Sequence, residues 1–308
     1  MTPAVEGGCH MRDVQRIGVV GAGVMGRGIA YQAAVSGFQV VLHDALPEVA
    51  EQAVKQIASL IKRQVEKGYL DPERGSEALP RIQTADSLES FGDCDFVIEA
   101  VVEDLDVKQD VFRKLDDICD DDVVLATNTS AKSITEIASA ASDPTRVCGM
   151  HFFNPVHRMK LVEVVRALQT ADWAVEQTER VGRLLGKEVV RIQERPGFAT
   201  SRISALVGNE AFYMLMEGVG TPEEIDRAIK LGLNFPMGPF ELGDLVGWDT
   251  RLKVLQYLHE TLGEKFRPCP LLVQYVKAGR LGRKTGWGVY RYDEQGRRIP
   301  DDEDHPAK

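Results

Sequence analysis

The sequence lacks the features that define several large classes of protein. No stretch approaches the ~18–20 uninterrupted apolar residues of a transmembrane helix, and the N-terminus has no basic start followed by an apolar run, as a secretory signal would. Its five cysteines form no Cys-x-x-Cys pair, so they fit neither a disulfide framework nor a zinc site. With 37 Lys and Arg against 47 Asp and Glu, the formal net charge of −10 argues against general nucleic-acid binding. We therefore expect a cytoplasmic protein without a metal site, a nucleic-acid partner or a membrane partner.

The composition is that of an ordinary globular protein. The chain has 308 residues, of which 44% are hydrophobic and 27% are charged, and this length leaves room for two domains with separate cores. We expect residues 1–12, which contain a Gly-Gly pair, to form a loose leader, with Met11 as an alternative start. The acidic end, Asp301–Asp304, is expected to be a frayed tail.

From Arg16 onward, short β-rich runs alternate with helix-length amphipathic segments, which is typical of a parallel sheet covered by helices. The predicted strands are Arg16–Val20, Gln39–Leu42, Asp95–Glu99, Val123–Ala126, Arg146–Met150, Leu161–Val165 and Glu188–Ile192. The long segment Pro47–Leu88 is expected to be mostly helical, and its early part, Glu48–Lys67, could stand off the sheet as an arm. The pattern predicts an α/β fold with a Rossmann-like, mostly parallel sheet.

The character of the chain changes at Arg195-Pro196-Gly197, where helical periodicity replaces the β-branched runs. We place a domain boundary there, with one domain over residues 13–195 and a helical one over 196–308. The predicted helices of the second domain are Phe198–Glu217, Pro222–Leu231, Gly238–Val246, Thr250–Leu262 and Pro270–Ala278. Thr221, Pro222 and Glu224 form a plausible helix start, with a cap and a capping-box acid.

A glycine motif follows the first predicted strand. Gly21, Gly23 and Gly26 form a Gly-x-Gly-x-x-Gly pattern before a predicted helix, which favours a dinucleotide pyrophosphate at the helix N-terminus. Asp44 ends the second strand 18 residues after Gly26, where a carboxylate can accept hydrogen bonds from an adenosine ribose and would repel a 2′-phosphate. The motif therefore predicts NAD and disfavours NADP. An ordinary Gly-rich turn and an ordinary acidic turn residue are the alternatives.

Further polar residues follow the later strands. Glu99 and Glu103 follow the third strand and Asn128-Thr-Ser130 the fourth, at the carboxyl edge where open α/β sheets bind ligands. His151 lands at the same edge, and Glu163 comes 12 residues later on the next strand, so a turn could bring its carboxylate against the imidazole. Such a pair suits hydride chemistry, because the imidazole removes a hydroxyl proton and the carboxylate stabilises the imidazolium. A structural histidine is the alternative.

Six ordered blocks resemble one family. GVVGAGVMGRGIA, VIEAVVEDLDVK, NTSAKSI, GMHFFNPVHRMKLVEVV, RPGFATSRI, and DRAIKLGLNFPMGPFELGDLVGWD with GRLGRKTGWGVY are similar to those of the L-3-hydroxyacyl-CoA dehydrogenases, and within them the monofunctional 3-hydroxybutyryl-CoA dehydrogenases. The match runs from about Gln15 to Tyr292. The resemblance implies an NAD-dependent oxidoreductase of short 3-hydroxyacyl-CoA thioesters that works as a homodimer.

The resemblance also implies roles for individual residues. His151 would be the catalytic base and Glu163 its partner, while Ser130 and Asn154 would hydrogen-bond the reacting oxygens. Lys67 would contact the CoA phosphates. The residues that would line the cofactor are Gly21, Gly23, Val24, Met25, Gly26, Asp44, Ala100, Glu103, Lys108 and Asn128.

One block departs from the family pattern. Ser201 stands where many members have Asn, and a serine in this substrate-binding position reaches less far, which leaves the acyl-chain preference open. A gulonate-type polyol-acid dehydrogenase is the runner-up, and it would need Arg158, Lys160 or Arg202 to hold a carboxylate. A non-catalytic NAD-binding relative is a third interpretation. Short-chain dehydrogenases are disfavoured, since none of the seven tyrosines is followed four residues later by lysine.

Overall fold

The structure, a computed structural model, describes residues 12–300. The expected leader up to residue 11, with its alternative start at Met11, and the acidic end, Asp301–Asp304, lie outside the described residues. The chain divides into two compact units, the first ending at Glu194 and the second beginning at Arg195, and each is described by itself.

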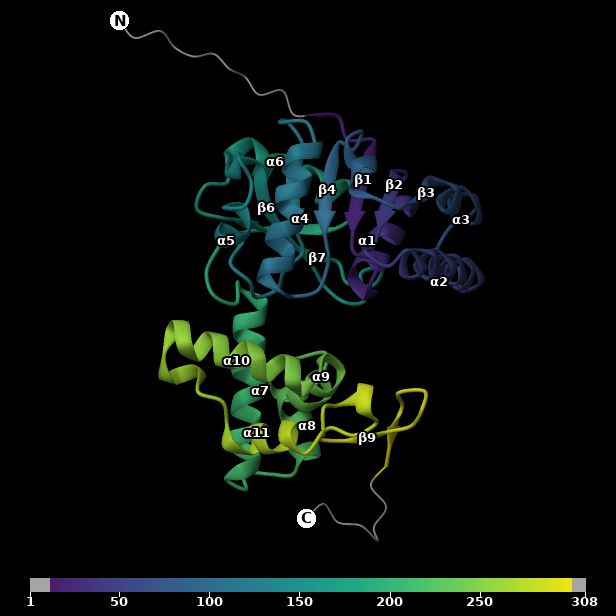
Figure 1. The fold of residues 1–308 in the computed structure, drawn as a ribbon. Coiled ribbons are helices and arrows are strands. Elements are labelled where there is room, and N and C mark those ends of the chain that lie inside the picture. The colour runs from purple at the N-terminus through teal and green to yellow at the C-terminus, as the bar shows by residue number, and fades with distance from the viewer. Residues whose placement is uncertain (1–11, 301–308) are drawn as a thin grey trace, which may run out of the picture. The chain divides into compact units, whose positions relative to one another are not determined.

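The first unit is built on an eight-stranded sheet (Figure 1), which confirms the predicted α/β class. Its strand order is β3-β2-β1-β4-β5-β6-β7-β8, and every neighbouring pair is parallel except β6 and β7. The strands are β1 (Arg16–Val20), β2 (Gln39–His43), β3 (Ile82–Ala85), β4 (Phe96–Glu99), β5 (Val124–Thr127), β6 (Val147–Phe152), β7 (Leu161–Arg166) and β8 (Glu188–Gln193). The central strands β4, β5 and β6 are buried along their whole length, which explains their nearly continuous apolar runs.

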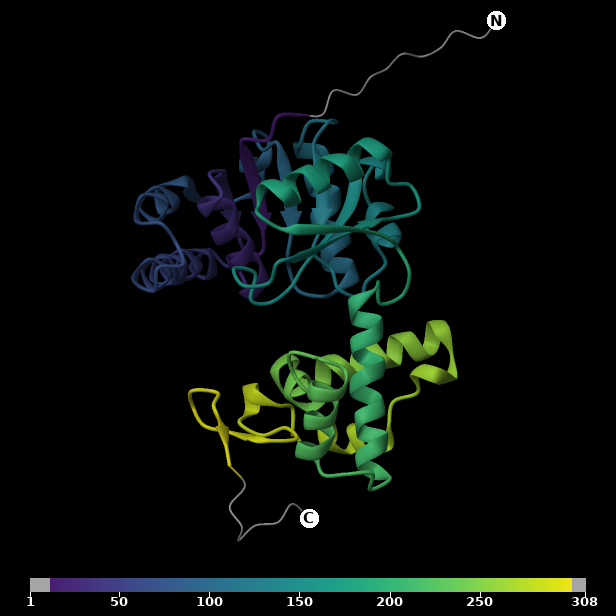
Figure 2. The ribbon, with the colours of Figure 1, turned by 180° about the vertical axis from the view of Figure 1, so that it is seen from behind.

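Helices cover both faces of this sheet. They are α1 (Val24–Val35), α2 (Pro47–Glu66), α3 (Pro72–Ala78), α4 (Leu105–Ile118), α5 (Ile134–Ala138) and α6 (Asp172–Leu184). Apolar residues of α1, α2 and α6 share one core with β1 and β2. Helix α4 stands in front of the sheet in Figure 1, and α6 stands in front of it in Figure 2, seen from behind. The two helices therefore lie on opposite faces.

The segment between β2 and β4 differs from the prediction in two ways. It is mostly helical, as predicted, but it also contains strand β3, which pairs in parallel with β2 and was not among the predicted strands. Helix α2 also does not stand free, because Ala50, Ala53, Ile57 and Ile61 are buried along one face and join the core of the first unit.

The second unit is helical, as predicted. It contains α7 (Thr200–Met216), α8 (Pro222–Gly232), α9 (Pro239–Val246), α10 (Trp248–Leu262) and α11 (Pro270–Lys277), with a short ribbon of β9 (Arg291–Tyr292) and β10 (Arg298–Ile299). Thr221 and Glu224 form the predicted capping box at the start of α8. The core is aromatic: the Phe212 ring meets the edges of Phe240 and Trp248 with centroids 5.4 and 4.6 Å apart.

The cysteines within the described chain are buried thiols without disulfides. Burial raises the pKa of Cys94 and Cys148 to about 12 and that of Cys119 to about 11, and it also raises the pKa of Cys269. Between residues 12 and 300 no group of three His, Cys, Asp or Glu side chains could hold a metal ion. None of the helices described is long and apolar enough to span a membrane.

Candidate active site

The glycine motif forms the turn between β1 and α1. Gly21 has φ +95°, and a Cβ on it would lie 2.6 Å from the carbonyl oxygen of Ala100, so no other residue fits the turn without strain. A Cβ on Gly26 would lie 1.7 Å from the carbonyl oxygen of Gly21. Gly23 differs, since its Cβ would enter open space. The first and last glycines thus hold the backbone together, and Gly23 leaves room beside the start of the helix.

The start of α1 fits a dinucleotide pyrophosphate. No described side chain caps this N-terminus, and its first turn carries no acidic residue, so the backbone amides and the helix dipole are available to an anion. Val24, at the first position, is 57% exposed. Asp44 closes the other side, because its carboxylate accepts hydrogen bonds from the backbone N of Ala22 at 2.8 Å and of Leu46 at 3.1 Å. The acidic residue expected to hold the adenosine ribose therefore sits directly against the glycine turn.

A buried ion-pair network follows β4. Lys108 is 1% exposed, and its Nζ lies 2.8 Å from Glu99 Oε1 and 3.2 Å from Glu103 Oε2. Glu99 also accepts hydrogen bonds from the backbone N of Val101 and from the hydroxyl of Thr127. Lys108 is thus held by two carboxylates and leaves almost no surface for a ligand. Its ammonium group contacts Glu103 and can orient that carboxylate.

Glu103 in turn holds the loop that follows β5. One of its oxygens accepts hydrogen bonds from the Thr129 hydroxyl at 2.6 Å and from the backbone N of Ser130 at 3.0 Å. Burial alone would raise the pKa of Glu103, but the charge of Lys108 and these hydrogen bonds outweigh burial and lower the pKa below its usual value. A carboxylate that stays ionised keeps Ser130 in place. The role of Thr129 carried no sequence signal beyond its position in the Asn-Thr-Ser run.

The histidine and the glutamate meet across two strands. His151 on β6 and Glu163 on β7 are register partners in the antiparallel pair, so their side chains leave the sheet on the same face. His151 Nδ1 lies 2.8 Å from Glu163 Oε2, and the two residues are 7% and 1% exposed. Because a carboxylate only accepts, Nδ1 carries the proton and Nε2 keeps a basic lone pair. An imidazole held in this way can serve as an oriented general base.

The remaining predicted residues of the first unit lie at the same edge of the sheet. Asn128 and Ser130 follow β5, and Asn128 Oδ1 accepts a hydrogen bond from the backbone N of Phe152, next to His151. Asn154 follows β6 and is exposed. Ser201 is different, since it lies in the second unit, in the first turn of α7.

A cationic groove of about 270 Å³ runs beside this edge. It is lined by Arg27 of α1 and Ser59 and Arg63 of α2, and it reaches Asn154 and His157. Burial lowers the pKa of His157, and the neighbouring charges of Arg158, Lys187 and Arg63 lower it further, as expected in a positive field. Lys67, predicted to contact CoA phosphates, is the C-cap residue after α2 and does not line this groove.

Comparison with known proteins agrees with these motifs. The family model "3-hydroxyacyl-CoA dehydrogenase, NAD binding domain" matches residues 16–195, and the model of the C-terminal domain of the same family matches residues 197–292. A 3-hydroxybutyryl-CoA dehydrogenase of Bradyrhizobium diazoefficiens is 45% identical over 91% of this chain and 96% of its own length. One of Clostridioides difficile is 40% identical over 91% of this chain and 100% of its own length.

A solved structure shows the same fold. The crystal structure of (S)-3-hydroxybutyryl-CoA dehydrogenase from Ralstonia eutropha has a TM-score of 0.88 and 42% identity, and the match covers 92% of this chain and 100% of that chain. Together these matches confirm the predicted family and its cofactor. The chain therefore belongs to the 3-hydroxyacyl-CoA dehydrogenase family and is an NAD-dependent oxidoreductase of that family.

Proposed function

We propose that the chain interconverts short-chain 3-hydroxyacyl-CoA and 3-ketoacyl-CoA thioesters, 3-hydroxybutyryl-CoA among them, with His151 as general base. The buried His151–Glu163 pair, with 2.8 Å between Nδ1 and Oε2, is the observation that carries the assignment of the base. The relatives named 3-hydroxybutyryl-CoA dehydrogenase support the short acyl chain.

In the proposed mechanism, the side chains prepare one oxygen for reaction. His151 Nε2 removes the proton of the 3-hydroxyl group, and Glu163 stabilises the imidazolium that results. The Ser130 hydroxyl and the Asn154 amide donate hydrogen bonds to the reacting oxygen as its charge develops. Glu103 keeps Ser130 in position through the backbone N of Ser130. In the reverse direction His151 returns the proton.

In this proposal NAD is held by the predicted first domain, residues 13–195, which corresponds to the first unit up to Glu194. The turn of Gly21, Gly23 and Gly26 and the amides of Val24 and Met25 bind the pyrophosphate, and Asp44 accepts hydrogen bonds from the ribose. Ala100, Glu103 and Asn128 follow β4 and β5 and line the nicotinamide end. When bound, NAD supplies the acceptor for the hydride that leaves the 3-carbon.

The CoA portion of the substrate takes the cationic groove. CoA carries several phosphate charges, and Arg27 and Arg63 place two guanidinium groups in the groove that reaches Asn154. Ser59 adds a hydroxyl. In this proposal Arg63 takes the role that the sequence suggested for Lys67.

The predicted second domain, residues 196–308, which corresponds to the unit that begins at Arg195, is proposed to contribute substrate contacts and the dimer surface. Leu231 and Leu233, at the end of α8, are 75% and 61% exposed, and such apolar side chains are suited to burial between two copies of the chain. Ser201, in its first helix, would contribute a hydrogen bond to the substrate. We place the enzyme in the cytoplasm as a homodimer. Sedimentation analysis showing a monomer at micromolar concentration would contradict the dimer.

The test follows NADH absorbance with purified protein and acetoacetyl-CoA. Longer 3-ketoacyl-CoA substrates and NADPH run in parallel, and gulonate with NAD runs in the reverse direction. We expect fast oxidation of NADH, slow oxidation of NADPH because Asp44 repels the 2′-phosphate, and the highest kcat/KM with short chains. Activity on gulonate alone would refute the proposal.

The role of His151 is tested by replacement. We expect His151→Ala to lower kcat by about 10²–10⁴-fold, as for the loss of one general base, and to leave NADH affinity nearly unchanged. His259→Ala is the matched control, because His259 lies on α10 in the second unit and pairs only with Glu264 among the contacts of its ring. A loss of NADH binding equal to the loss of rate would contradict the assignment.

A further inference from the structure

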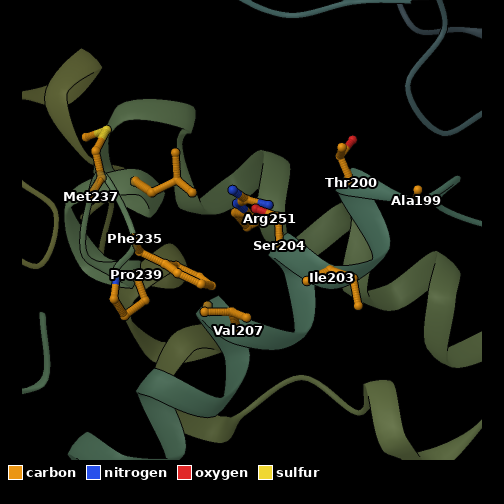
Figure 3. A pocket seen from close by; sticks show the side chains of 11 residues that line it. Ala199, Thr200, Ile203, Ser204, Val207, Phe235, Met237, Pro239 and Arg251 are labelled. Carbon is orange, nitrogen blue, oxygen red and sulfur yellow. The ribbon is translucent and has the colours of Figure 1, made fainter. Parts of the chain in front are cut away.

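The second unit contains a cavity of about 410 Å³, which lies within the usual size range of small-molecule sites. We call it the Arg251 pocket. Its walls come from α7, from α9 and the segment before it, and from α10 (Figure 3). The apolar residues that line it are Ile203, Val207, Phe235, Met237, Pro239 and Leu242. The walls alone would suit an aliphatic chain.

Arg251 is the exception in this lining. Figure 3 shows its side chain in the middle of the pocket, between Phe235 and the side chains of α7. Arg251 is 8% exposed, and burial, with no compensating charge, lowers its pKa to about 10. Among residues 12–300 no carboxylate pairs with its guanidinium and no group accepts a hydrogen bond from that guanidinium, although its backbone N donates to Gly247 O in α10. An arginine this deeply buried is normally paired, because desolvation of the charge is costly.

Three acidic residues of α9 and α10 are engaged with partners other than Arg251. Asp249 pairs with Lys284 at 2.6 Å, and Glu241 pairs with Lys230 at 2.7 Å. Asp244 is buried and accepts hydrogen bonds from the indole of Trp248 and from backbone amides near β9. The pocket thus keeps a cation without a counter-ion among apolar walls.

Two properties of the pocket define its ligand. A carboxylate matches a guanidinium by two parallel hydrogen bonds and neutralises its charge, whereas a neutral group would leave that charge unpaired. The hydroxyl of Ser204, which also lines the pocket, is one further donor for such a group. The apolar walls disfavour a strongly hydrated phosphate, and they favour a hydrocarbon chain attached to the anion.

We propose that the Arg251 pocket binds a short aliphatic chain that ends in a carboxylate, and that Arg251 recognises this carboxylate. The ligand is either a free short-chain fatty acid or the far end of a dicarboxylic acyl group in a thioester substrate. The second source rests on the proposed function, and it would extend the substrate class to 3-hydroxy thioesters with a terminal carboxylate.

The first experiment measures binding of hexanoate, 1-hexanol and hexylamine to the full chain by isothermal titration calorimetry. We expect hexanoate to bind more tightly than hexanol and hexylamine not to bind. Arg251→Met should weaken hexanoate binding by about 10- to 150-fold, the effect of losing a hydrogen bond to a charged group, and leave hexanol unchanged. Lys253→Met is the matched control, since Lys253 is an exposed cation on the same helix.

The second experiment distinguishes the two sources of the carboxylate. It compares 3-oxoadipyl-CoA with 3-oxohexanoyl-CoA, which have the same chain length and differ only in the terminal carboxylate. A kcat/KM loss in Arg251→Met for 3-oxoadipyl-CoA alone identifies the acyl group as the ligand. Equal kcat/KM losses or none, together with Arg251-dependent hexanoate binding, identify a free acid.

Three results would overturn the proposal. One is an affinity of the wild-type chain for hexanoate that is no higher than its affinity for hexanol. This measurement does not depend on the folding of any variant. Another is equal weakening of hexanoate and hexanol in a folded Arg251→Met. The third is dissociation of a dimer by Arg251→Met without carboxylate binding, which would make a second copy of the chain the occupant. Activity with acetoacetyl-CoA is measured in every sample, so failure of the proposed function is detected separately.

Discussion

Replacing Glu163 with glutamine should slow the reaction while leaving the fold and NAD binding intact. Glu163 is 1% exposed, and its Oε2 lies 2.8 Å from His151 Nδ1, so water cannot substitute for the carboxylate. Glutamine has nearly the same shape but no charge. The variant therefore loses the charged partner of the imidazolium with little change in packing.

The magnitude follows from the type of hydrogen bond. A hydrogen bond to a charged group contributes about 1.5–3 kcal/mol, and this stabilisation is greatest when His151 carries the proton it has removed. Since about 1.4 kcal/mol corresponds to a tenfold change in rate, kcat should fall by about 10- to 150-fold. The loss is expected in kcat more than in KM, because the charge develops in the transition state.

The assay is steady-state oxidation of NADH with acetoacetyl-CoA, with NADH affinity measured by fluorescence. Glu188→Gln is the matched control, because Glu188 begins the adjacent strand β8 and is exposed. A Glu163→Gln enzyme with wild-type kcat would refute the reasoning. So would a variant that loses rate only as far as it loses NADH binding or folded protein.

Three other variants test separate parts of the molecule. Arg63→Met should raise KM about tenfold for acetoacetyl-CoA but not for acetoacetyl-N-acetylcysteamine, which lacks the phosphates. An equal rise in KM for both substrates would show that Arg63 does not bind the CoA phosphates. Gly26→Ala should lower both stability and NADH affinity by about 1–3 kcal/mol, because its Cβ would lie 1.7 Å from the Gly21 carbonyl oxygen. Gly23→Ala, whose Cβ would enter open space, should keep the stability of the free enzyme. Equal melting temperatures of the two variants would contradict this prediction. Burial lowers the pKa of Lys187 from 10.5 to about 8. Between pH 8 and 10.5 the unfolded chain binds more protons than the folded chain, so the free energy of unfolding should rise with pH by up to about 3 kcal/mol. Urea denaturation of Lys187→Met should lack this rise, and parallel curves of unfolding free energy against pH for the two proteins would contradict the prediction.

Much of the fold was predictable because the core strands carry local signals. The bounds of β1 agree with its β-branched run, and the start of α8 agrees with its Thr-Pro-x-Glu pattern. Strand β3 was not predictable, because its two middle residues are polar and exposed and it follows a helical segment. Its strand conformation depends on pairing with β2, which is a contact distant in sequence.

For the candidate site, residue types and their place at the sheet edge could be predicted, but contacts could not. The spacing of His151 and Glu163 allowed a pair, whereas the antiparallel register that sets them opposite each other is visible only in the structure. Lysine positions show the same limit. Sequence shows a charge at Lys108 but not that its side chain is buried between two glutamates. Arg63 and Lys67 are one helical turn apart, and only the structure shows that Arg63 lines the groove while Lys67, past the last residue of α2, does not.

The rate at which the buried cysteines are modified measures how often each unit opens. Thiol reagents attack the thiolate, and burial keeps that form scarce in Cys94, Cys119 and Cys148 of the first unit and in Cys269 of the second. Modification at these positions therefore requires the surrounding structure to open first. Mass spectrometry of labelled peptides would give an opening rate for each unit, without any engineered probe. Protection of the first three thiols by added NAD would measure how strongly the cofactor holds its unit closed.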